Sequence, residues 1–212
     1  MNDKTAEQDL ENFETAEMTS STAHKIDSDR IIYVSRRLVP QKYSYGLPVL
    51  CDFGEAQFGE FDYLPDIQPY QYRAPEVILD IPWDEKVDIW SVGVMAWDLL
   101  GNGNLFRTTG GPEDVQDNIY IYHLAHMIAL LVPPPKDFLR RTKDRLWGWF
   151  DGDGIWKGAA EIPNSSPEST ETVLQGEDKV LFLNFARKML KWKPEERSTT
   201  KELIDDPWLN SD

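Results

Sequence analysis

The sequence predicts one mainly α-helical domain of the α+β type, preceded by an acidic lead. Short β-branched and apolar runs bounded by Pro and Gly occur within residues 31–53. After residue 75 the apolar residues follow helical spacing, in runs that end at Gly or Pro. The 212 residues, of which 41% are hydrophobic, suffice for one core.

The first 30 residues hold many acids and few large apolar side chains, among them Leu10 and Phe13. We expect this lead to be largely unstructured, with helix confined to about residues 9–18. The domain proper is then residues 31–212.

Two strands and a central helix are expected next. The strands are the runs at 31–39 and 47–53. Asp84 is expected to cap a helix over 85–100 that is apolar on nearly every side and ends at Gly101. Such a helix lies in the middle of a fold.

Three more helices are expected, over 119–132, over 177–192 and after Ser198. Pro133 and Pro194 stop the first two, and Thr199 with Glu202 offers a capping box for the third. Residues 142–176, rich in Gly, Trp, Ser and Pro, are expected to be mostly loop.

Composition excludes several classes of protein. With 22 Lys+Arg against 37 Asp+Glu, the net charge of −15 argues against nucleic acid and permits a basic protein partner. The longest apolar stretch is shorter than the roughly 18 residues of a membrane span, so no membrane association is expected. A single cysteine, Cys51, excludes an intrachain disulfide. With no signal peptide visible, we expect a protein of the cytoplasm, the nucleus or both.

Three short motifs stand in a fixed order, and two more follow them. They are Asp52-Phe53-Gly54, Tyr72-Arg73-Ala74-Pro75-Glu76, Asp88-Ile89-Trp90-Ser91-Val92-Gly93, Lys193-Pro194-Glu195-Glu196-Arg197 and Pro207-Trp208. From about residue 31 to the end, this order resembles the large, C-terminal lobe of a eukaryotic protein kinase, from the DFG turn to the last helix. The stretch DIQPYQYRAPEVIL, the very short activation segment and the ending DDPWL are most similar to SR-protein kinases.

The resemblance implies that Asp52 binds the Mg²⁺ ions that bridge the phosphates of ATP. Phe53 would pack inward, and Gly54 would let the turn change shape. Taken alone, these three residues are an ordinary turn.

The resemblance also implies a structural ion pair between Glu76 and Arg197, which would tie the activation segment to the helical subdomain. Asp88 would accept hydrogen bonds from the backbone of the catalytic loop. Taken alone, Asp88 is an exposed acid at a helix start, favoured by the helix dipole.

Several parts of a kinase have no counterpart in the sequence. They are the glycine-rich loop, the β3 lysine with its αC glutamate, and the HRD-type catalytic loop with its asparagine. The resemblance therefore implies a large lobe that begins after the catalytic loop and lacks the small lobe. ATP and Mg²⁺ are the cofactors of the family, but we expect weak or no binding and no catalysis by this chain alone.

Substrate handling departs from the family pattern. Pro69 stands where such kinases usually carry a threonine in the substrate-facing loop. In SR-protein kinases, carboxylates of the large lobe bind Arg-rich substrates. The residues of this chain that align with those carboxylates are not acidic: Gly103, Tyr122 and Ala129. A nearby acidic loop either replaces these missing carboxylates or is simply a solvated loop. Its acids are Glu113, Asp114 and Asp117.

Other candidate sites are weaker. A calcium loop opening at Asp151 would need a glutamate at Ile162, so we interpret this segment as a turn. His123 and His126 have no third ligand nearby and are interpreted as core or surface residues. Cys51, expected on a buried strand, is interpreted as an inert thiol.

Two functions of different classes remain open. One is part of a longer serine/threonine kinase that phosphorylates proteins, Arg/Ser-rich ones included. The other is a catalytically dead, pseudokinase-like module that binds a protein partner. Self-association is also expected, because nothing in the acidic lead can cover the apolar surface of the helix at 85–100.

Overall fold

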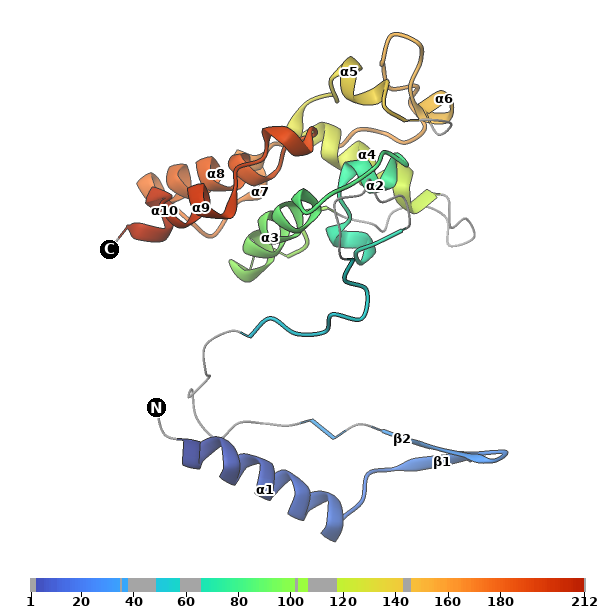
Figure 1. Ribbon diagram of the computed structural model, residues 1–212, viewed down its shortest axis with the longest axis vertical. Helices are drawn as coiled ribbons and strands as arrows, with labels where there is room; N and C mark the ends of the chain where they lie inside the picture. The colour runs from blue at the N-terminus through green and yellow to red at the C-terminus, as the bar shows by residue number, and fades with distance from the viewer. Residues whose placement is uncertain are drawn as a thin grey trace. The chain divides into compact units, whose positions relative to one another are not determined.

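The computed structural model describes residues 3–34, 36–37, 49–57, 66–101, 103–106, 118–142 and 146–211. They belong to two compact units, Met1–Glu55 and Ala56–Asp212. In chain order the elements are α1 (Asp3–Thr19), β1 (His24–Asp27), β2 (Arg30–Tyr33), η1 (Tyr70–Tyr72), α2 (Pro75–Ile78), α3 (Lys86–Leu99), α4 (Asn118–Leu131), α5 (Lys136–Leu139), α6 (Leu146–Trp149), α7 (Pro167–Thr170), α8 (Gly176–Met189), η2 (Pro194–Glu196), α9 (Thr200–Ile204) and α10 (Pro207–Asn210) (Figure 1). The predicted class, mainly α with a small β element, is confirmed.

The first unit consists of α1 and an antiparallel hairpin in which His24 pairs with Tyr33 and Asp27 with Arg30 (Figure 1). Arg36 forms an ion pair with Glu17 and donates to the carbonyls of Ala16 and Ser20 at the end of α1. A cation bonded to the last carbonyls stabilises a helix C-terminus.

The structure therefore differs from the largely unstructured lead that composition indicated. Helix α1 begins well before residue 9, and β1 forms within the first 30 residues. The carbonyl contacts of Arg36, which follows both strands in the chain, could not be read from local composition.

The expected strands at 31–39 and 47–53 are only partly present. Strand β2 ends at Tyr33, and the described part of the second run, residues 49–53, has no strand. Val49 and Leu50 are 81% and 83% exposed. A strand is defined by its pairing, and no neighbouring strand among the described residues pairs with this run.

The second unit is built on the packing of α3 against α8, which lie side by side (Figure 1). A Cβ at Gly93 would lie 3.0 Å from Leu190 Cδ2 and from Met189 Cβ, so only glycine permits this approach. The largest fully buried aromatic side chains of the unit are Trp90, Trp97, Phe106, Phe138, Phe150 and Phe182.

The helix predicted at 85–100 is confirmed as α3. The Asp84 carboxylate accepts from Lys86 N at 2.9 Å at its start, and Gly101, with a φ of +82°, follows its end. One side of α3 is buried, but Val92, Met95 and Leu99 are 41%, 45% and 77% exposed. Only one side of α3 therefore packs into the core.

The later helices are also confirmed, with shifted ends. Helix α4 ends just before Val132 and Pro133, and α8 ends at Met189, three residues before the expected end. Thr199 and Glu202 form the predicted capping box of α9. Among the described residues, no helix has both the length and the apolar character that a membrane crossing requires.

Candidate functional site

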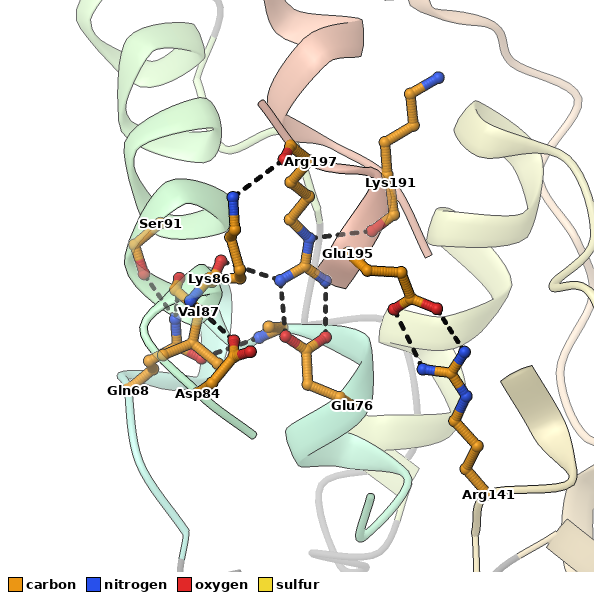
Figure 2. A network of polar contacts seen from close by, with 11 residues as sticks. Gln68, Glu76, Asp84, Lys86, Val87, Ser91, Arg141, Lys191, Glu195 and Arg197 are labelled. Carbon is orange, nitrogen blue, oxygen red and sulfur yellow. Dashed lines mark hydrogen bonds and ion pairs between the residues drawn. The ribbon is translucent and has the colours of Figure 1, made fainter. Parts of the chain in front are cut away.

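Glu76 and Arg197 form an ion pair inside the second unit. Arg197 Nη1 and Nη2 donate to the two carboxylate oxygens of Glu76 at 2.5 and 2.6 Å (Figure 2). Both side chains are 0% exposed. Such a bidentate geometry fixes the relative position of α2 and the turn after η2, which are 121 positions apart in sequence.

Arg197 makes two further hydrogen bonds, both to backbone carbonyls. Its Nε donates to the Lys191 carbonyl at 3.1 Å, and Nη1 also donates to the Lys86 carbonyl at 2.9 Å (Figure 2). The guanidinium lies 5.1 Å from the ring centre of Trp90, a cation–π contact. Arg197 thus joins α2, the first turn of α3 and the segment 191–197.

Gln68 fixes the segment before α2 onto α3. Its Oε1 accepts from Ala74 N at 2.9 Å, and its Nε2 donates to the Val87 carbonyl at 2.8 Å and to Ser91 Oγ at 2.6 Å (Figure 2). The φ of Gln68 is +71°, a left-handed conformation that is uncommon outside glycine. The three side-chain contacts hold it there.

The Arg73 side chain also anchors the segment before α2. It donates to the carbonyls of Ile67 and Gln68 at 3.1 and 3.0 Å, and to the carboxylate of Asp66 at 3.1 Å. Its guanidinium lies 4.7 Å from the ring centre of Tyr70 and donates to the hydroxyl of Tyr120 on α4.

The roles of Gln68 and Arg73 were not expected from the sequence. Both lie within DIQPYQYRAPE, so the motif could have drawn attention to them. Pro69, which has no hydroxyl, precedes η1 directly. The anchoring of this segment comes from its neighbour Gln68 and from Arg73.

Asp88 lies on the exposed face of α3, the stripe formed by Asp88, Val92, Met95 and Leu99. Its carboxylate has no hydrogen-bond partner within the described part of the chain. The pKa of Asp88 is raised, first by partial desolvation and then by the nearby charge of Glu85. The loop backbone that the resemblance implies as its partner has no counterpart in the sequence.

Asp52, Phe53 and Gly54 lie in the first unit. Asp52 is exposed and has a φ of +64°, which aspartate tolerates better than most residues. Phe53 is 62% exposed, so the inward packing that the resemblance implies is not present in this structure.

A magnesium ion would need more ligands than Asp52 supplies. A carboxylate is a suitable hard ligand, but Mg²⁺ takes about six oxygens. In the regions that the structure describes, no group of three His, Cys, Asp or Glu side chains is placed to hold a metal ion. These residues therefore do not form a magnesium site by themselves.

The expected substrate groove is only partly described. Gly103 is exposed and has a φ of +73°, and Tyr122 and Ala129 lie half-buried on α4. Glu113, Asp114 and Asp117 lie outside the described residues.

Two of the other candidate sites have a clear structure. The Asp151 carboxylate accepts from the backbone N–H groups of Asp153 and Ile155 at 2.9 Å, so this segment is a turn. Cys51 is exposed, so the expectation that it lies on a buried strand is wrong, because 49–53 forms no strand.

His123 is buried in the core, with its ring 5.1 Å from that of Phe106. Burial lowers its pKa from 6.5 to about 3, with smaller contributions from the charges of His126 and Arg73. Unfolding lets this histidine take up a proton below pH 6.5, whereas the folded state resists it.

We expect the free energy of unfolding to fall between pH 6.5 and 5 by up to about 1.4 kcal/mol per pH unit because of His123. The His123→Phe variant should lose most of this slope in denaturant titrations. The His24→Gln variant, changed on an exposed strand, should keep it. An equal slope in His123→Phe and the parent would contradict the assignment.

A protein-family model described as the protein kinase domain matches residues 42–209 of the chain. A serine/threonine protein kinase of Aspergillus fumigatus is 45% identical over 199 residues, which are 93% of this chain and 49% of that protein. The probable serine/threonine-protein kinase sky1 of Dictyostelium discoideum is 33% identical over 76% of this chain and 24% of its own length. The dual specificity protein kinase CLK2 of Mus musculus is 28% identical over 74% and 31%, respectively.

The chain spans about half or less of the length of these curated relatives. The matched residues include the Asp52 turn, both partners of the buried ion pair, and the exposed face of α3. The family match, the order of the motifs and the pairing of Glu76 with Arg197 agree with one another, and the chain belongs to the protein kinase domain family.

Proposed function

We propose that the chain forms the large-lobe part of an SR-protein-kinase-type serine/threonine kinase, which transfers a phosphoryl group from ATP to protein hydroxyls. The observation that carries this proposal is the buried pairing of Glu76 with Arg197. It joins two of the motifs on which the resemblance rests, in a chain whose relatives include serine/threonine kinases.

Arg/Ser-rich proteins are the substrates that we propose for the longer kinase. The net charge of −15 supports a basic partner. The positions that align with groove carboxylates are not acidic in this chain, so the grip on arginine would rest on other acids.

The chain alone should not catalyse the transfer. Phosphoryl transfer depends on positioned charges. A kinase supplies them with the β3 lysine, the catalytic base, the asparagine of the catalytic loop and the metal-binding aspartate. Of these four groups the sequence contains only the last, Asp52. The Asp52 carboxylate would supply one ligand to the magnesium ion that neutralises phosphate charge.

A chimera tests this proposal: the chain replaces the matched part of the Aspergillus fumigatus kinase. The chimera should phosphorylate an Arg-Ser peptide with Mg-ATP, and Asp52→Ala should lower the rate at least about 100-fold. Glu55→Ala, an exposed acid three residues on, should leave the rate unchanged. A folded chimera without turnover, or one that keeps its rate after Asp52→Ala, would contradict the proposal.

A catalytically dead interaction module is the second candidate. The exposed face of α3 favours it: its apolar side chains lie next to the Asp88 carboxylate, which has no hydrogen-bond partner in the described residues, and such a stripe is suited to contact another chain. Under this proposal the chimera is inactive, while the chain binds a protein partner through this face.

A further inference from the structure

We draw no further inference here: the strongest candidate, the exposed face of α3 formed by Asp88, Val92, Met95 and Leu99, belongs to the site already described, and nothing in the described residues shows what covers it.

Discussion

Replacing Arg197 by alanine should lower the free energy of unfolding by about 3–5 kcal/mol, because the Glu76 carboxylate is then left buried without its partner. The carbonyls of Lys191 and Lys86 each also lose a donor. Denaturant titration and thermal melting measure the loss. The double variant Glu76→Leu with Arg197→Met should cost less than the sum of the two single changes, because it removes both charges together.

Arg141→Ala provides the matched control. Arg141 forms a bidentate pair with Glu195, as Figure 2 shows, but the two side chains are 38% and 53% exposed. An exposed ion pair contributes only about 0–1 kcal/mol. If Arg197→Ala melted like the parent or like Arg141→Ala, the structural role of the buried pair would be refuted.

The exposed face of α3 should make the isolated chain bind a hydrophobic dye and self-associate. Changing Met95→Gln and Leu99→Gln together should lower dye fluorescence several-fold and shift the chain toward a monomer in light scattering. Both side chains are at least 45% exposed, so stability should change by no more than about 0.5 kcal/mol per site.

Val180→Gln on α8 is the control for this face. Val180 is 56% exposed but lies outside the stripe on α3, so its loss should leave association unchanged. A parent chain that stays monodisperse and silent to the dye would contradict the expectation.

The helices of the second unit could be predicted from sequence because each signal is local. Apolar spacing gave α3, α4 and α8, and the capping residues Thr199 and Glu202 gave α9. The observed ends of these helices differ from the predicted ends by one to three residues. Local backbone geometry sets where a helix ends, as the φ of +64° at Val132, directly after α4, illustrates.

The candidate site was harder to predict from sequence, because it is held together by contacts between residues that are distant in the chain. The pairing of Glu76 with Arg197 followed only from resemblance, since no local pattern joins positions 121 apart. The contacts of Gln68 with α3 could not be predicted, because they depend on a left-handed backbone at a residue that is not glycine.

The first unit was predicted least well. Composition identified α1 as an acidic segment but gave no sign of the hydrogen bonds that Arg36, which lies beyond the hairpin, donates to the carbonyls at its end. The apolar run at 49–53 has strand propensity but no strand partner in the described part of the chain, so propensity alone did not produce a strand.

The chain alone is expected to be inactive, and this expectation tests most directly the proposal that it is one part of a longer kinase. Purified chain, incubated with Mg-ATP and an Arg-Ser peptide, should form no phosphopeptide above a mock preparation, because the sequence supplies neither the base nor the lysine. If the chain showed turnover above the mock preparation, and Asp52→Ala abolished that turnover, the expected inactivity of the chain alone would be contradicted.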